Sequence, residues 1–282
     1  MEGKESPSPR EALPPEISAA YEDPDYYMKY MGGAKEYAGK TLQRKYLRAI
    51  SLAQSRRDPI QRILDVGCGR GEIVNHFCLL GIQAIGVEYS KAACSIAHAL
   101  LSKNPKGHLG KIINIRDCTL DFPPDHFDVA FMLDVVEHLY ESQLDSYYAQ
   151  IRRVLRPGGV LVVHTWPNRL QRETIPPQYE VFVRSFFALP YRIMFRRPIK
   201  RTVRDSCEEL VHVNEHTPDQ LTSQLAKHSL SPLVFTSYFA GNAPDSLSDF
   251  LGETVLNMGV AGLLPGVRKF FNRYIWAIAT KH

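Results

Sequence analysis

Short apolar stretches alternate through the middle of the chain with longer segments in which apolar residues recur every three or four positions. Short apolar runs bounded by turn residues predict buried strands, and the longer periodic segments predict helices. The predicted strands are residues 62–66, 82–87, 112–115, 127–133 and 160–164, and the predicted helices between them are residues 71–80, 90–101 and 143–155. This alternating order predicts a doubly wound parallel α/β sheet.

The residues before this block have a different composition. Residues 1–16 are rich in proline, serine and charge, which predicts a disordered tail. An aromatic segment that contains Tyr27 and Tyr30 then leads into a predicted helix at residues 35–53. We expect residues 17–56 to form an N-terminal helical lid over a ligand, and the alternative is that the tyrosines cover an edge of the sheet.

After the fifth predicted strand the alternation stops. Residues 166–215 contain five prolines and no strand-helix pattern, so we expect an insertion that caps the sheet edge. The alternation resumes at residues 217–220, where the sequence Thr-Pro-Asp-Gln predicts a capping box with proline at the first helical position. The elements predicted in residues 216–282 are a helix to residue 228, strands at 233–239 and 274–279, and a helical excursion at 246–271.

Length and composition limit the class of protein. A chain of 282 residues with 44% hydrophobic residues suits one large domain with an insertion. No apolar stretch approaches the roughly 18 residues of a membrane span, and residues 1–10 lack an apolar signal region. We therefore expect a cytoplasmic protein with no transmembrane segment. The five cysteines are scattered without a C-x-x-C pair, so neither a disulfide framework nor a metal site is expected.

Positive charge is concentrated in one part of the predicted insertion. The net charge is only +4, but residues 184–204 contain seven arginines and lysines and no acidic residue. This segment could contact an anionic lipid surface, the phosphates of a nucleic acid or a phosphorylated substrate, and the alternative is a solvated basic face. No pattern in the sequence predicts an oligomeric state.

The strongest chemical signal is the turn after the first predicted strand, where Gly67, Gly69 and Gly71 stand at alternate positions. Glycine accepts positive φ and has no Cβ, so such a turn can bring backbone N–H groups against a bound molecule. The spacing G-x-G-x-G, preceded by Asp65, differs from the dinucleotide fingerprint G-x-G-x-x-G and disfavours a pyrophosphate site. Glu88 ends the second predicted strand, where its two carboxylate oxygens can accept hydrogen bonds from both hydroxyls of a ribose.

At this turn and at Glu88 the chain resembles the class I S-adenosylmethionine-dependent methyltransferases, and motifs at residues 117–118, 127–129, 133–139 and 153–159 agree. The stretch Leu-Asp-Val-Val-Glu-His-Leu at residues 133–139 is similar to the ubiquinone-biosynthesis-like O-methyltransferase branch. Glu88 departs from the family's commoner aspartate by one methylene.

The resemblance implies S-adenosyl-L-methionine as cofactor and a core at residues 57–165 that binds it. It also implies a Rossmann-like, seven-stranded, mostly parallel sheet, with the last strand antiparallel, helices on both faces and the cap insertion after strand five. The candidate cofactor-binding residues are Asp65, Gly67, Cys68, Gly69, Gly71, Glu88, Tyr89, Ser90, Asp117, Cys118, Asp134 and Val135.

Methyl transfer from a sulfonium is an in-line displacement, so a base is needed only where the acceptor must lose a proton. The candidate catalytic residues are His138, just past the fourth predicted strand, and His164, which ends the fifth. Both stand at the carboxyl edge, where open α/β sheets bind ligands. The alternatives are that His138 packs against the sheet and that His164 bonds to a loop carbonyl. Candidate substrate contacts are Tyr27, Tyr30, His212 and His216, and the two histidines could instead cap local backbone.

These features predict an S-adenosylmethionine-dependent methyltransferase that acts on an oxygen of a small-molecule, glycan or lipid-linked acceptor. An RNA or protein methyltransferase that docks through residues 184–204, and a cofactor-binding regulator without activity, are the alternatives. No Asp/Asn-Pro-Pro-Tyr/Phe motif follows the fourth predicted strand, which disfavours methylation of adenine or cytosine amino groups.

Overall fold

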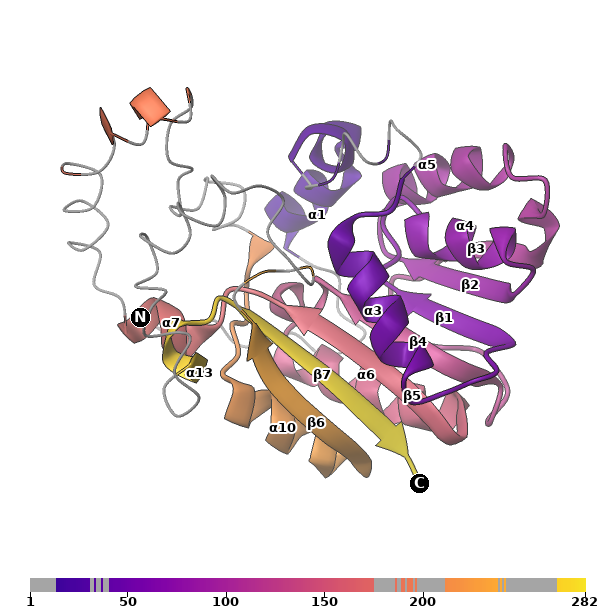
Figure 1. Cartoon of the computed structure of the whole chain (residues 1–282). Coiled ribbons are helices and arrows are strands. Elements are labelled where there is room, and N and C mark those ends of the chain that lie inside the picture. Colours follow the sequence, from indigo (N-terminus) through magenta and orange to yellow (C-terminus); the bar gives the residue numbers. More distant parts are fainter. Residues whose placement is uncertain are drawn as a thin grey trace.

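A seven-stranded sheet organises the chain (Figure 1). The computed structural model describes residues 14–30, 33, 37, 41–174, 186, 189–190, 192–194, 196, 211–237, 239, 241 and 268–282. The strand order is β3-β2-β1-β4-β5-β7-β6, and β7 runs antiparallel to both of its neighbours. The strands are β1 (Arg62–Val66), β2 (Gln83–Glu88), β3 (Gly110–Asn114), β4 (Phe127–Leu133), β5 (Leu155–Thr165), β6 (Leu230–Ser237) and β7 (Tyr274–Lys281). The predicted fold class is confirmed.

Helices cover both faces of the sheet. The α-helices are α1 (Pro15–Glu22), α3 (Arg44–Gln54), α4 (Glu72–Leu79), α5 (Lys91–Leu101), α6 (Glu141–Val154), α7 (Arg169–Thr174), α10 (Pro218–Lys227) and α13 (Arg268–Phe271). A π-helical turn, η1 (Tyr26–Tyr30), and two 3-10 turns, η2 (Gly107–Leu109) and η3 (Val136–His138), complete the described helices. One apolar core lies between the sheet and α3, α4 and α5, and the other lies between the sheet and α6 and α10.

Local sequence signals place several of these elements where they were predicted. All residues of β4 are buried, which explains the continuous apolar run from Val129 to Leu133. Ser90 caps α5 because its Oγ accepts a hydrogen bond from Ala93 N–H at 3.0 Å. Thr217 and Gln220 form the predicted capping box at the start of α10.

Element boundaries differ from the prediction at several places. Helix α3 begins only at Arg44, because Gln43 has extended backbone. Strand β5 begins at Leu155 rather than residue 160, because Leu155 ends α6 in an extended conformation. Strand β6 begins at Leu230, directly after Ser229 turns the chain with a φ of 54°. Most of the predicted tail, of the cap and of the 246–271 excursion lies outside the described residues.

Within the described part of the chain, no helix combines the length and apolar character needed to cross a membrane.

Candidate active site

A cavity of about 480 Å³ lies at the carboxyl edge of the sheet. Its walls come from the glycine turn after β1, the ends of β2, β4 and β5, the N-terminal segment and α3. The predicted site residues that line it are Tyr27, Gly67, Cys68, Gly69, Glu88, Tyr89, Cys118, Asp134, Val135, His138, His164 and His212. Candidate residues from both the cofactor and the catalytic sets are therefore brought to one cavity.

Other predicted residues support the walls without lining them. Asp65 is buried within β1, where burial and then the nearby Glu88 raise the pKa of its carboxyl group. Gly71 begins α4 with a φ of 75°, and an added Cβ would lie 2.8 Å from Ala97 Cβ, so this glycine lets α4 approach α5. Asp117 is exposed, and its Oδ1 accepts a hydrogen bond from Thr119 N–H at 3.1 Å.

Three further predicted residues also lie outside the lining. Ser90 is buried and caps the start of α5. His216 is also buried, and this burial lowers its pKa. The side chain of Tyr30 is outside the described residues.

The glycine turn and Glu88 form one unit. The N–H groups of Gly67 and Cys68 donate to Val87 O at 2.8 and 3.1 Å, which closes the turn over the end of β2. Glu88 Oε2 accepts from Gly69 N–H at 2.8 Å, and Oε1 accepts from Ser90 N–H at 2.9 Å. Burial raises the pKa of Glu88 despite these backbone donors. A carboxylate offers about four lone-pair sites, so both oxygens keep acceptor capacity toward a ligand.

A second polar unit lies where β4 and β5 end. Leu133 and His164 are paired across the two strands, and Asp134 N–H donates to His164 O at 2.9 Å. Asp134 then turns with a φ of 57°, which places its Oδ1 2.5 Å from His164 Nδ1. Its other oxygen, Oδ2, forms an ion pair with Lys45 Nζ from α3.

The charges of this unit are fixed by their neighbours. Burial alone would raise the pKa of Asp134, but the charges of Lys45 and His164 outweigh it and hold the pKa well below its usual range. Burial alone would lower the pKa of Lys45, but Asp134 raises it overall. His164 is 1% exposed, with its ring 5.4 Å from Tyr274 and 4.4 Å from Trp276, and its Nε2 has no partner among the described residues.

Glu137 and His138, on the turn η3, lie beside this unit. His138 Nδ1 lies 3.1 Å from Val211 O, and since a carbonyl only accepts, Nδ1 carries the proton. Burial lowers the pKa of His138, so its ring is neutral. Burial, and then Asp134, raise the pKa of Glu137 to about 8. Ligand atoms of Glu137, His138 and His212 lie within 4.8 Å of one another, a grouping that could hold a metal ion although the sequence predicted none.

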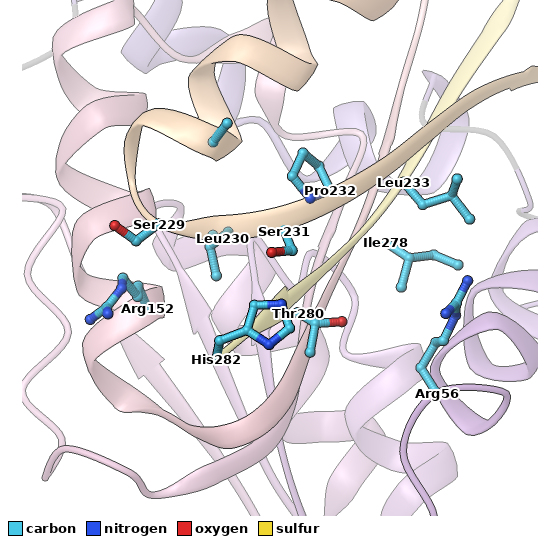
Figure 2. A pocket seen from close by; sticks show the side chains of 11 residues that line it. Arg56, Arg152, Ser229, Leu230, Ser231, Pro232, Leu233, Ile278, Thr280 and His282 are labelled. Carbon is cyan, nitrogen blue, oxygen red and sulfur yellow. The ribbon is translucent and has the colours of Figure 1, made fainter.

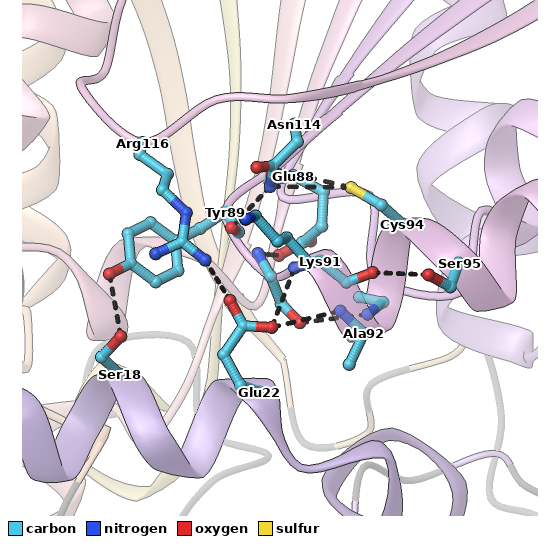
Figure 3. A network of polar contacts seen from close by, with 12 residues as sticks. Ser18, Glu22, Glu88, Tyr89, Lys91, Ala92, Cys94, Ser95, Asn114 and Arg116 are labelled. Atoms are coloured by element: carbon cyan, nitrogen blue, oxygen red, sulfur yellow. Dashed lines mark hydrogen bonds and ion pairs between the residues drawn. The ribbon is translucent and has the colours of Figure 1, made fainter.

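The N-terminal segment closes one side of the cavity. Figure 3 shows Glu22 of α1 directed at both Arg116 and the start of α5. Its Oε2 accepts from Lys91 N–H and Ala92 N–H at 3.1 and 3.2 Å, and Oε1 forms an ion pair with Arg116. Farther along, the fully buried Arg70 donates from Nη1 to Tyr27 O at 2.8 Å.

Several lining residues had no signal in the sequence. They come from the segment before α3, α3 and β7: Gln43, Lys45, Tyr46 and Tyr274. None of them stands at the end of a predicted parallel strand or in a glycine turn. A pattern of apolar spacing in α3 predicts which face is buried, but it does not predict that a lysine is buried with it.

A larger hollow of about 620 Å³ lies away from these motifs, where β6 begins and β7 ends (Figure 2). Arg56 and Arg152 stand at its opposite ends. Thr280 of β7 pairs with Val160, which places the hollow toward the amino-terminal side of the core strand β5. None of the predicted site residues lines it.

Residues 64–163 match the family model described as "Methyltransferase domain". A ubiquinone biosynthesis O-methyltransferase of Bradyrhizobium sp. (strain ORS 278) is 38% identical over 106 residues, which are 37% of this chain and 39% of that protein. The chain thus matches less than half the length of that relative.

Solved structures share the fold at low sequence identity. Geranyl diphosphate C-methyltransferase from Streptomyces coelicolor A3(2), in complex with Mg²⁺, geranyl diphosphate and S-adenosyl-L-homocysteine, has a TM-score of 0.54 at 16% identity and covers 94% of this chain and 88% of its own. Phosphoethanolamine N-methyltransferase 2 of Haemonchus contortus, in complex with S-adenosyl-L-methionine, has a TM-score of 0.54 at 16% identity and covers 83% of this chain and 52% of its own.

The sheet order, the glycine turn and the matched segment agree on one family. This chain contains a methyltransferase domain of the class I S-adenosylmethionine-dependent superfamily.

Proposed function

We propose that this protein transfers the methyl group of S-adenosylmethionine to a hydroxyl oxygen of a small-molecule, glycan or lipid-linked acceptor. The observation that carries the proposal is that a single cavity contains both the Gly67–Glu88 unit and the Asp134–His164 pair. Similarity alone does not select the acceptor atom, because the relatives named above are an O-, a C- and an N-methyltransferase.

The residues of the glycine turn fit the cofactor. Gly67 has a φ of 70°, and a Cβ added there would lie 2.4 Å from Val135 Cγ2, so only glycine leaves this wall of the cavity open. The spare acceptor capacity of Glu88 suits the two ribose hydroxyls. Gly67, Cys68 and Gly69 would hold the amino-acid end, and Cys118 would lie near the base. When bound, the cofactor supplies a methyl group that is activated by a sulfonium.

His164 fits the role of general base. Asp134 is held as a carboxylate, so His164 Nδ1 carries a proton and donates a hydrogen bond to Oδ1. In the neutral form of the ring, Nε2 is then the unprotonated nitrogen, and it has no partner among the described residues. Such a nitrogen can take the proton of a hydroxyl acceptor. His138 has the same tautomer, set by Val211 O, and is the second candidate.

Residues of the predicted lid and of the predicted cap also line the cavity. Tyr21, Tyr26 and Tyr27 line the cavity, which supports residues 17–56 as a lid over the cofactor. Trp166 and His212, at the two ends of the cap 166–215, line it as well and support contact between the cap and the acceptor.

Residues 184–204 are proposed to contact an anionic surface. Most of this segment lies outside the described residues, but Arg192 and Arg196 are exposed, and Ile193 and Met194 beside them are 71% and 68% exposed. Exposed apolar side chains among arginines suit an anionic lipid surface. Co-sedimentation with phosphatidylglycerol vesicles should fall in R192E/R196E and not in the exposed-surface control K103E. Equal vesicle binding by the unaltered protein, R192E/R196E and K103E would contradict this proposal.

The function is tested with methyl-labelled S-adenosylmethionine and separate hydroxyl, amine, RNA and protein acceptors. We expect label only on hydroxyl acceptors, and His164→Gln should lower turnover about 100-fold while the cofactor Kd changes less than twofold. Label on RNA or protein would favour the docking alternative. Cofactor binding without labelling of any acceptor would favour a regulator.

A further inference from the structure

We propose that Lys45 is a positioning residue for the transfer: it holds Asp134 so that Asp134, in turn, keeps the proton on Nδ1 of His164 and leaves Nε2 to act as the base. This inference rests on the proposed function and extends it to a residue outside the segment that matches the methyltransferase family model.

The geometry assigns each carboxylate oxygen of Asp134 its own partner. Oδ2 forms the ion pair with Lys45 Nζ, and Oδ1 lies 2.5 Å from His164 Nδ1. The side chains of Lys45 and Asp134 are only 15% and 20% exposed, so little solvent screens the pair. Because Lys45 occupies Oδ2 from the α3 side, the carboxylate cannot rotate away from His164 without breaking an ion pair.

Lys45 also balances charge around the imidazole. Among the titratable groups near His164, Asp134 and Tyr274 contact its ring. Lys45, Tyr46 and His138 line the same cavity, and Glu137 accepts a hydrogen bond from the adjacent Thr165. Asp134 favours a second proton on the ring, and Lys45 opposes it. Removal of the ammonium leaves the carboxylate unopposed, which favours the imidazolium over the base form.

The chain contains a matched control outside the cavity. Lys227 Nζ lies 2.6 Å from Asp145 Oδ2, and His228 Nε2 lies 2.9 Å from Asp145 Oδ1. This triad repeats the Lys-Asp-His chemistry, but none of its three residues lines the cavity.

The test compares Lys45→Met, Lys45→Arg and the control Lys227→Met. In Lys45→Met the midpoint of the acid limb of kcat should move up by about one pH unit, so that kcat at a pH well below the midpoint falls about tenfold. The acceptor KM should change less than threefold and the cofactor Kd less than twofold. Lys45→Arg should restore the midpoint, and Lys227→Met should leave it unchanged. An unmoved midpoint in Lys45→Met, or loss of cofactor affinity in parallel with kcat, would overturn the proposal.

A second readout does not need turnover. The ring nitrogen signals of His164, followed by NMR against pH, should shift their midpoint upward in Lys45→Met by the same unit, while those of His228 should not. If no acceptor is methylated by the unaltered protein, the proposed function fails, and the NMR titration still decides the role of Lys45. Equal His164 midpoints in both proteins would refute it.

Discussion

At the scale of single residues, the cofactor side of the cavity depends on one missing side chain. Gly67 combines positive φ with a close approach to Val135, and the neighbouring Gly69 N–H is held by Glu88. A side chain at position 67 must therefore move the wall that the ligand would contact.

Gly67→Ala should lower the affinity for S-adenosylmethionine at least tenfold, as measured by calorimetry, because the new Cβ lies 2.4 Å from Val135 Cγ2. The matched control is Gly81→Ala. Gly81 also has positive φ, of 84°, but its added Cβ would meet only Lys106 Nζ, at 3.5 Å. Both variants should lose about 1 kcal/mol of unfolding free energy from backbone strain, and only Gly67→Ala should lose affinity. Equal affinities would show that the turn does not touch the ligand.

At the scale of elements, α1 is fastened to the rest of the molecule by one carboxylate. Glu22 accepts from two N–H groups at the start of α5 and pairs with Arg116, so it acts as a distant cap for a helix that begins next to Glu88. Anions are favoured at a helix N-terminus by the unpaired N–H groups and the helix dipole.

Glu22→Gln should therefore loosen the proposed lid. Loss of roughly 1 kcal/mol at the cap predicts that bound S-adenosylmethionine dissociates about fivefold faster, as followed by stopped-flow fluorescence. Asp25→Asn is the control, because its ion pair with Lys29 is exposed on both sides and contributes little. An unchanged dissociation rate in Glu22→Gln would mean that α1 does not retain the cofactor.

The same scale shows what sequence patterns could and could not predict. The strands of the parallel block and the capping box at Thr217 follow from local spacing, and the structure confirms them. The cofactor-side candidates could be proposed because strand ends and a glycine turn mark them. Lys45 was not found, since its contact with Asp134 joins residues 89 positions apart and no local pattern encodes such a pair.

At the scale of the whole molecule, the two edges of the sheet have different roles. The matched segment, residues 64–163, supplies the glycine turn and Asp134, whereas α3, the cap ends and β7 supply Lys45, Trp166 and Tyr274. The proposed acceptor side therefore comes largely from outside the matched segment. At the amino edge, Asp128 of β4 connects the start of β1 to Arg57 and Arg156 through hydrogen bonds.

Asp128→Asn should lower stability without affecting the cavity. The Asp128 side chain is 1% exposed and accepts from Gln61 N–H, Arg62 N–H, Arg57 and Arg156 at 2.9 to 3.0 Å. Loss of this charge should cost about 3 kcal/mol of unfolding free energy at pH 7, measured by urea titration, with the cofactor Kd unchanged. Asp219→Asn, at an exposed ion pair with Lys269, should change stability by less than about 0.5 kcal/mol.

The difference in unfolding free energy between the unaltered protein and Asp128→Asn should depend on pH in one direction. Burial would raise the pKa of Asp128, but its N–H and arginine partners outweigh burial and lower the pKa below the ordinary value. Its stabilisation is therefore complete above the unfolded pKa, about 4, and is lost as the pH falls through the folded pKa. The stability gap between the two proteins should shrink below pH 4. A constant gap would show that the Asp128 charge is not responsible.

We propose that S-adenosylmethionine lies across the carboxyl ends of β1, β2 and β4. A crystal structure of the complex with S-adenosylhomocysteine tests it most directly. We expect the ribose hydroxyls to lie within hydrogen-bonding distance of Glu88 and the amino-acid end to lie against Gly67 to Gly69. Density for the ligand elsewhere, for example in the hollow between Arg56 and Arg152, with the glycine turn empty, would contradict it.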